Sequence, residues 1–294
     1  MYKQVCVSVM AATTTYLRPD MLAAALDALA SKPLTVAAGC TDLFPSTESK
    51  ALPYDVLDIT GIEGLSGIRL DENGLTIGGT TTWSEIAEAD LPPALHALQL
   101  AAREVGSRQI QNRGTLAGNI CNASPAADGI PPLLVLNAQV ELSAASGVRH
   151  LPLTEYLLGP RKTQRRADEI LTSVRIPSPA LAGQSHFLKL GARTYLVISI
   201  AMTAARVVIE DGVVTEAALA VGACGPVARR IDAAEQALIG QPLNPDAITD
   251  QLVAGALSPI DDIRADAGFR ITSAAELLRR TLRAIEAGPG GMTQ

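Results

Sequence analysis

Short apolar runs alternate with helical periods along roughly the first hundred residues. Leu22, Leu26 and Leu29 fall on one face of a helix predicted over 19–30, and Asp20 is placed to cap it. The apolar run at 34–38 is typical of a buried strand and ends in a tight polar turn. The other elements predicted here are strands over 56–59, 67–70 and 75–77, the last two forming a hairpin with an Asn73-Gly74 turn, and helices over 84–89 and 92–102.

The segment 107–128 breaks this pattern. Its periodicity is weak and it has many small or amide residues, so we interpret it as a functional loop. Beyond it we expect a helix over 130–136 and strands over 139–142 and 169–175. Pro177-Ser178-Pro179 then interrupts the pattern and marks the expected domain boundary.

The C-terminal part has a different order of elements. Strands are predicted at 185–190, 199–209 and 213–221, and helices follow at 233–238, 246–257 and 269–287. Strands followed by helices favour an antiparallel sheet backed by helices. The expected fold class is therefore α+β, with two α/β lobes at 1–177 that divide near residue 61, and an antiparallel three-stranded sheet with a small helical bundle at 178–294.

Composition narrows the possible functions. The chain has 294 residues, a net charge of −6 and 3% aromatic residues, so it offers neither a basic face nor a stacking surface for nucleic acid. The N-terminus lacks the pattern of a secretory signal, and no run reaches the about 18 apolar residues that a membrane span needs. The four cysteines are too far apart to suggest a metal site or a disulfide framework. These features indicate a cytoplasmic protein without a membrane span.

Two loops of small and polar residues carry the candidate chemistry, Ala38–Asp42 directly after a predicted strand and Gly114–Asn119. Glycine lets a backbone approach a ligand closely, and such loops can direct backbone N–H groups at a phosphate without a lysine. Two of them would suit a pyrophosphate, although each alone is compatible with an ordinary turn. The glycine signatures of Rossmann and P-loop proteins are absent from the sequence.

These loops belong to longer segments that make the chain recognisable. Thr35–Leu43, Ile77–Thr82 and Gln109–Asp128 occur in this order, followed by 187–193, 221–226 and 259–270. Together they resemble the FAD-binding medium subunit of the xanthine dehydrogenase and carbon monoxide dehydrogenase family. The resemblance covers almost the whole chain, and its central segment is highly specific. It implies that 1–177 is a two-lobed FAD-binding domain of the PCMH type.

The resemblance also implies the FAD site, residue by residue. The matching positions are Val36, Ala37, Ala38, Gly39, Cys40, Thr41, Asp42 and Leu43 in the first loop; Ile77, Gly78, Thr80 and Thr81 towards the isoalloxazine end; Gly114, Thr115, Ala117, Gly118 and Asn119 in the second loop; and Asp128, Leu171 and Lys189. A lysine near a flavin ring can stabilise its reduced anion. No catalytic residue and no metal ligand is expected in this chain.

The family's activity is divided among chains, and this has consequences for partners. The resemblance implies a large subunit that binds the molybdopterin cofactor and hydroxylates the substrate, and a small subunit with [2Fe-2S] clusters. FAD on this chain would pass the electrons to NAD, a quinone, a cytochrome or oxygen. Two alternatives stay open: a flavin-free scaffold subunit, and a stand-alone FAD oxidase, although neither loop offers a catalytic base for the latter.

Three departures from the family pattern bear on flavin binding. Cys40 stands where a second glycine is usual, so the turn is strained if this residue needs a positive φ. Its thiol either lies near the pyrophosphate or is a tolerated small substitution. Ala117 replaces the first of two usual glycines, and Leu196 and Val197 stand where acidic residues are frequent.

The remaining polar groups are interpreted as structural. His96, His150 and His186 lack the spacing of metal ligands, and Asp261-Asp262 suits a capping turn. The basic residues Arg161, Lys162, Arg165 and Arg166 form either a solvated face or a contact for an acidic partner subunit. There is no cysteine between Asp128 and Leu171, so the extra iron–sulfur cluster of some relatives is not expected.

Overall fold

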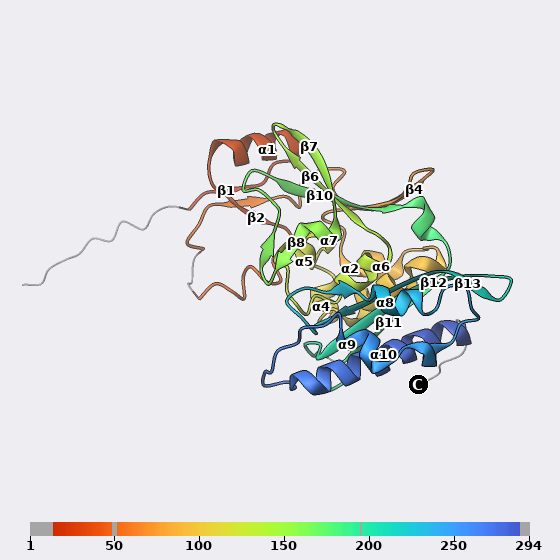
Figure 1. The fold of residues 1–294 in the computed structure, drawn as a ribbon. Coiled ribbons are helices and arrows are strands. Elements are labelled where there is room, and N and C mark those ends of the chain that lie inside the picture. Colours follow the sequence, from red (N-terminus) through yellow and green to blue (C-terminus); the bar gives the residue numbers. More distant parts are fainter. Residues whose placement is uncertain (1–13, 49–51, 195, 289–294) are drawn as a thin grey trace, which may run out of the picture.

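The computed structural model describes residues 14–48, 52–194 and 196–288, which form two small lobes and a C-terminal sheet covered by helices (Figure 1). The first lobe holds a parallel sheet in the order β1-β3-β2. Its elements are β1 (Tyr16–Leu17), α1 (Leu22–Ser31), β2 (Thr35–Ala37) and β3 (Val56–Asp58). The sheet is parallel because α1 carries the chain back between β1 and β2. The helix and both predicted strands are confirmed.

One detail of this lobe differs from the prediction. Asp20 does not cap α1, because the N-cap residue is Met21, whose side chain makes no capping hydrogen bond. Burial holds the helix instead, since Ala25, Leu26 and Leu29 pack in one cluster with Leu57 of β3. An apolar face can therefore fix a short helix without a cap.

The second lobe is built on an antiparallel sheet in the order β4-β5-β10-β6-β7. The strands are β4 (Ile68–Asp71), β5 (Gly74–Gly78), β6 (Gln139–Ala144), β7 (Gly147–Pro152) and β10 (Ile170–Pro177). The predicted hairpin forms, but its turn residues are Glu72 and Asn73, and the positive φ of 131° falls on Gly74. Strand β7 was missed because it is a largely exposed edge strand with few apolar residues.

Helices connect the strands of this lobe, and here one prediction was wrong. The segment 107–128 is not a continuous loop, since it contains α4 (Arg108–Gln111) and α5 (Leu116–Asn122). Both helices are too short to show a helical period in the sequence. The other elements are α2 (Trp83–Glu88), η1 (Pro93–Leu95), α3 (His96–Glu104), α6 (Ile130–Val135), α7 (Leu153–Tyr156) and the hairpin strands β8 (Leu157–Gly159) and β9 (Lys162–Thr163).

The C-terminal sheet is antiparallel, as expected, and a short fourth strand extends the predicted three. After η2 (Ser178–Leu181) it consists of β11 (Gln184–Leu190), β12 (Ala201–Glu210), β13 (Val213–Gly222) and β14 (Arg229–Arg230). The helices predicted at 233–238 and 269–287 are confirmed as α8 (Asp232–Gln236) and α10 (Ala267–Ala287). The single helix predicted over 246–257 is wrong, because the chain forms η3 (Pro245–Ala247) and then a new helix, α9 (Asp250–Ala254), capped by Thr249.

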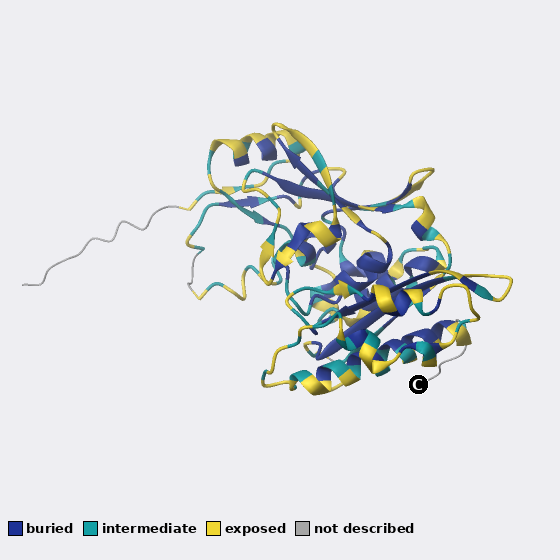
Figure 2. Ribbon diagram, in the orientation of Figure 1, coloured by how far each residue is buried: buried dark blue, intermediate teal, exposed yellow. Residues whose placement is uncertain are grey.

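Helices cover this sheet on both faces. The long α10 packs on β11 and β12, whereas α3 and α6 of the second lobe contact β11, β12 and β13. Seven successive residues of β12 are therefore buried, which appears as a continuous dark ribbon in Figure 2. The main core cluster accordingly includes Trp83 and Leu133 of the second lobe together with Phe187 and Met202 of the C-terminal sheet.

A buried arginine joins these layers. Arg206 of β12 is 2% exposed and donates hydrogen bonds to the carbonyl oxygens of Val135 (3.0 Å) and Ala182 (3.1 Å). It also pairs with Glu216 at 2.7 Å. One guanidinium thus satisfies a carbonyl at the end of α6 and one in the connection before β11, and its loss would leave both unpaired.

Replacing Arg206 by methionine should lower the free energy of unfolding by about 2–4 kcal/mol, because buried acceptors lose their donor. Urea unfolding followed by circular dichroism measures this. Arg229→Met on the exposed residue of β14 is the matched control and should change stability by less than about 0.5 kcal/mol. Equal effects of the two substitutions would contradict the role given to Arg206.

Candidate functional site

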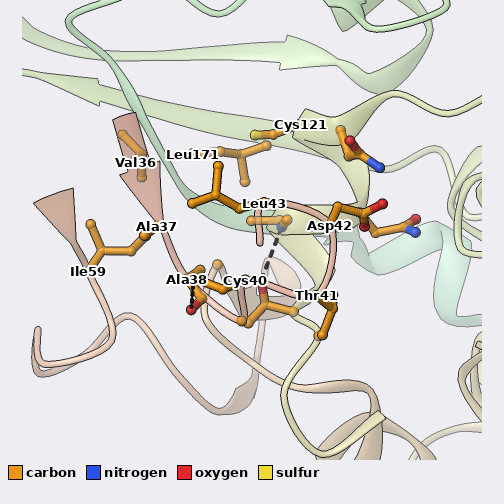
Figure 3. A pocket seen from close by; sticks show the side chains of 18 of the residues that line it. Val36, Ala37, Ala38, Cys40, Thr41, Asp42, Leu43, Ile59, Cys121 and Leu171 are labelled. Atoms are coloured by element: carbon orange, nitrogen blue, oxygen red, sulfur yellow. Dashed lines mark hydrogen bonds between the residues drawn. The ribbon is translucent and has the colours of Figure 1, made fainter. Parts of the chain in front are cut away.

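A cavity of about 810 Å³ lies where the two sequence-predicted loops meet. Its walls come from the end of β2 with the turn after it, the start of α5, the β8–β9 hairpin and the start of β10. Figure 3 shows the side chains of Val36, Leu43, Cys121 and Leu171 around the hollow. The volume is in the range of about 300–1,000 Å³ that is usual for cofactor sites.

Backbone contact holds the two loops together. A Cβ atom on Gly39 would lie 1.9 Å from the carbonyl oxygen of Arg113 and 2.9 Å from the Cα of Gly114. Only glycine fits there, because any other side chain would have to displace backbone rather than a flexible side chain. On the other side, a Cβ on Gly114 would lie 3.4 Å from Oγ1 of Thr41. The glycines of the two loops therefore serve close packing of one loop on the other.

The first loop offers a run of backbone donors. Among the described residues, the five amides of 39–43 have no hydrogen-bond acceptor, although the carbonyls of Cys40 and Asp42 accept from Phe44 and Ser46. Successive unpaired N–H groups form a concavity suited to an anion. The free amides are compatible with the prediction that this loop binds a phosphate, which stays a prediction.

Cys40 occupies the strained position that its substitution for glycine suggested. Its φ is 59°, in the left-handed region that favours glycine. The thiol donates to the carbonyl oxygen of Ala38 at 3.4 Å (Figure 3). Burial, and then the negative charge of Asp58, raises the pKa of the Cys40 thiol. The group is therefore a protonated donor at neutral pH and not a nucleophile.

The second loop differs from the first because its amides at 116–118 already donate hydrogen bonds within the protein. Thr115 caps α5 by accepting from the N–H of Gly118 at 3.1 Å, and the N–H groups of Leu116 and Ala117 donate to carbonyl oxygens of Thr81 and Gly79. The loop thus presents side chains to the cavity. The Oδ1 atom of Asn119 is buried without a hydrogen-bond partner within the described parts of the chain. An orphaned buried amide oxygen indicates a missing polar partner.

The structure gathers fourteen of the twenty predicted site positions around this cavity: Val36, Ala37, Ala38, Gly39, Cys40, Thr41, Asp42, Leu43, Gly114, Thr115, Ala117, Gly118, Asn119 and Leu171. The four residues expected towards the isoalloxazine end, Ile77, Gly78, Thr80 and Thr81, do not line the cavity. From that segment only Gly79 does. Ile77 is fully buried, and the hydroxyl of Thr81 is bonded to the backbone of Gly67. These four residues hold the wall in place.

Asp128 and Lys189 also lie outside the cavity wall, but they are bonded to each other. Nζ of Lys189 is 2.7 Å from Asp128, whose other oxygen accepts from the Ser199 hydroxyl at 2.6 Å. Burial raises the pKa of the Asp128 carboxyl against the opposing charge of Lys189. This buried network connects the segment after α5 to the C-terminal sheet at β11.

Fifteen residues around the cavity were not in the predicted site. They are Leu34, Thr35, Pro45, Ser46, Ile59, Gly79, Trp83, Val105, Ile110, Cys121, Asn122, Arg161, Arg165, Glu169 and Ile170. Of the basic cluster, interpreted from the sequence as a solvated face or a partner contact, Arg161 and Arg165 line the cavity. Their place at the cavity depends on a two-strand hairpin of five strand residues, which is too short to leave a periodic pattern.

Glu169, beside the hairpin, is a buried carboxylate that binds two arginines. Its side chain is fully buried and bonded to Arg149 at 2.7 Å and Arg166 at 3.1 Å. Burial alone would raise the pKa of the Glu169 carboxyl, but the hydrogen bonds from Arg149 and Arg166 hold it below its ordinary value. The carboxylate thus stays ionised and its charge is balanced by two arginines.

The groups interpreted as structural are mostly accounted for. Asp261 accepts from the N–H of Ala267 at the start of α10, and Asp262 pairs with Arg264 and Arg270, but the N-cap of α10 is Asp266. His150 pairs with Glu141. Across the described ranges no group of three or more His, Cys, Asp or Glu side chains could hold a metal ion. No helix in those ranges is long and apolar enough to cross a membrane.

Comparison with known proteins agrees with this geometry. The family described as the FAD binding domain in molybdopterin dehydrogenase matches residues 10–179, and the CO dehydrogenase flavoprotein C-terminal domain matches residues 186–285. The chain therefore belongs to the FAD-binding medium subunits of the molybdenum hydroxylase family.

Individual relatives extend over most of the chain. A xanthine dehydrogenase FAD-binding subunit of Escherichia coli O157:H7 is 32% identical over 289 residues, which cover 95% of this chain and 98% of that protein. The nicotinate dehydrogenase FAD-subunit of Eubacterium barkeri is 36% identical, with coverage of 72% and 73%. A carbon monoxide dehydrogenase structure from Hydrogenophaga pseudoflava superimposes with a TM-score of 0.85 at 26% identity, covering 93% of this chain and 97% of the matched chain.

The residues present fit FAD. The amides of 39–43 suit the oxygens of a pyrophosphate, and the unpaired Oδ1 of Asn119 needs a donor such as a hydroxyl or an amine. The cradle is narrow because Gly39 and Gly114 bring two backbones into contact.

A methyl group at Gly39 should open this cradle. Gly39→Ala places a Cβ 1.9 Å from a backbone oxygen, so we expect a loss of about 2–4 kcal/mol of stability and at least tenfold weaker FAD binding. Thermal melting and flavin fluorescence titration test both. In the control Gly255→Ala, the new Cβ meets only one backbone oxygen, at 3.7 Å, and both measurements should stay near wild type. Normal FAD binding by the Gly39 variant would refute the packing argument.

The contribution of Glu169 to stability should depend on pH. A carboxyl whose folded pKa is lowered stabilises the protein fully above its unfolded pKa of about 4.3 and loses this contribution as the pH falls through the lower folded value. Glu169→Gln should therefore be clearly less stable than wild type at pH 7, and the difference should shrink towards pH 3. Urea unfolding at several pH values measures it, with Asp168→Asn as the neighbouring control. A pH-independent difference would contradict this origin.

Proposed function

We propose that this chain is the electron-transfer subunit of a heterotrimeric molybdenum hydroxylase, and that it passes electrons from a small iron–sulfur subunit through FAD to an external acceptor. The observation that carries the proposal is the cavity, which is lined by both loops. Among the residues that the structure describes, five amides of the first loop and the buried Oδ1 of Asn119 in the second have no hydrogen-bond partner. Bound FAD supplies the redox chemistry, which no side chain here provides.

The chain's own part in this function is to bind and orient. We propose that 1–177 carries the cofactor and that 178–294 supports it. The first loop would hold the pyrophosphate through its amides, while Thr115 and Asn119 would contribute a rigid wall and an acceptor. Ile77, Gly78, Thr80 and Thr81 stay predictions for the isoalloxazine end. Asp128 and Lys189, which form a buried ion pair with each other, also stay predicted cofactor contacts.

Partner chains follow from the division of labour in the family. We propose a large subunit with the molybdopterin cofactor, where the substrate is hydroxylated, and a small subunit with [2Fe-2S] clusters, in a cytoplasmic complex. The acceptor could be NAD, a quinone, a cytochrome or oxygen. Cys40 and Ala117, which motivated the scaffold alternative, leave the cradle intact, because the Cys40 thiol is turned to Ala38 and Ala117 is buried.

The purified full-length chain should bind FAD and show a flavin band near roughly 450 nm. It should hydroxylate none of a panel of heterocycles and aldehydes, because it provides no substrate chemistry of its own. Activity should appear only when the neighbouring subunits are co-purified. A colourless chain that cannot be loaded with FAD would support the scaffold alternative, and substrate turnover by the chain alone would support the oxidase alternative.

A further inference from the structure

The β8–β9 hairpin brings two arginines to the cavity. Arg161 lies in its turn and Arg165 just beyond β9, and both contribute to the cavity wall. Neither position belongs to the two glycine loops.

Arg161 is held in place by backbone and side chain together. Its N–H donates to the carbonyl oxygen of Ala123 at 2.9 Å, and its guanidinium is bonded to Oδ1 of Asn122. Both Arg161 (φ 58°) and Ala123 (φ 46°) are in the left-handed region, although neither is glycine. Such conformations cost energy and persist only where the surroundings determine them. The hairpin turn is thus fastened to the end of α5, the helix that begins at the second loop.

Arg165 is fixed by carbonyl oxygens. Its Nη1 atom donates to Glu169 at 2.7 Å and to Arg166 at 3.1 Å. These partners are neutral, as is the amide of Asn122 that binds Arg161. A guanidinium held by neutral acceptors keeps its full charge for a further ligand.

The charges of the cavity wall are therefore unbalanced. Its carboxylates are Asp42, which is exposed, and Glu169, which Arg149 and Arg166 neutralise from outside the cavity. Within the described residues, neither Arg161 nor Arg165 has a carboxylate within ion-pair distance. The glycine loops contribute no lysine or arginine to the wall, so the hairpin is its source of positive charge.

We propose that Arg161 and Arg165 bind the ADP half of FAD, as an electrostatic clamp opposite the amides of the first loop. The inference rests on the proposed binding of FAD in this cavity. The negative charge of FAD is carried by its pyrophosphate, and the amides of 39–43 supply dipoles but no net charge. The two guanidinium groups would hold the phosphates by charge-assisted hydrogen bonds and provide the missing countercharge.

If Arg161 and Arg165 bind the phosphates, their loss should weaken only ligands that carry phosphate, whereas a purely structural role would affect all ligands alike. Arg161→Asn removes the charge with a residue that tolerates a left-handed backbone, and Arg165→Gln removes the second charge. Each should raise the Kd for FAD and for ADP about tenfold and reduce the salt dependence of binding, while the Kd for riboflavin, which has no phosphate, stays unchanged. Arg161→Lys should retain most of the affinity.

The experiment uses the full-length chain freed of flavin, with fluorescence titration for FAD and riboflavin and calorimetry for ADP at low and high salt. Lys162→Gln is the matched control, because this lysine lies in the same hairpin but outside the cavity wall, and it should bind all three ligands like wild type. Melting without flavin verifies that each variant is folded.

The outcomes separate the two proposals. A wild-type chain that binds no FAD overturns the proposed function itself. If the wild type binds FAD and the arginine variants bind it equally well, the clamp alone is wrong. Equal weakening for FAD, ADP and riboflavin, or an equal effect of Lys162→Gln, would also overturn the clamp, since it would show a general distortion or a nonspecific charge effect.

Discussion

The site depends on one contact between two backbones. The carbonyl of Arg113 lies where Gly39 would carry a side chain, so the turn after β2 and the turn before α5 pack directly on each other. This contact fixes the distance between a loop that offers amides and a loop that offers side chains. The amides after Thr115 are occupied, partly by the start of α5 and partly by the carbonyl oxygens of Gly79 and Thr81. The second loop is thus fixed by its hydrogen bonds, whereas the first retains free donors for a ligand.

Trp83 packs between the second loop and the main core cluster. It is almost fully buried, and it lies close enough to Gly114 and Gly129 that a Cβ at either position would meet its ring, at 3.3 Å and 2.4 Å. The same cluster continues into the C-terminal sheet through Phe187 and Met202. Close packing of this kind deforms little, which suits a site that must hold a cofactor in a fixed orientation.

The sequence predicts much of this structure, for identifiable reasons. The strand at 56–59 is apolar enough to show its burial, and the central strands of the C-terminal sheet are long and regular. The strand predicted as buried at 34–38 is only half-buried apart from Ala37, because it lines the cavity. The glycine loops could be related to a pyrophosphate from residue chemistry, whereas FAD itself came from the family resemblance. What was missed has little local signature: α5 is held by a cap and by neighbouring carbonyls, and β7 and β14 are edge strands. The place of Arg161 depends on a tertiary contact with Ala123, which no local pattern encodes.

The sheet of β11, β12 and β13 has a further consequence. Sequence families divide the chain into two modules, at 10–179 and 186–285, yet α3 and α6 of the first module cover one face of the sheet formed by the second. Each half separated from the other would expose a broad apolar surface to water. Two modules that match separate sequence families thus share one core, and each should be prone to aggregation without the other.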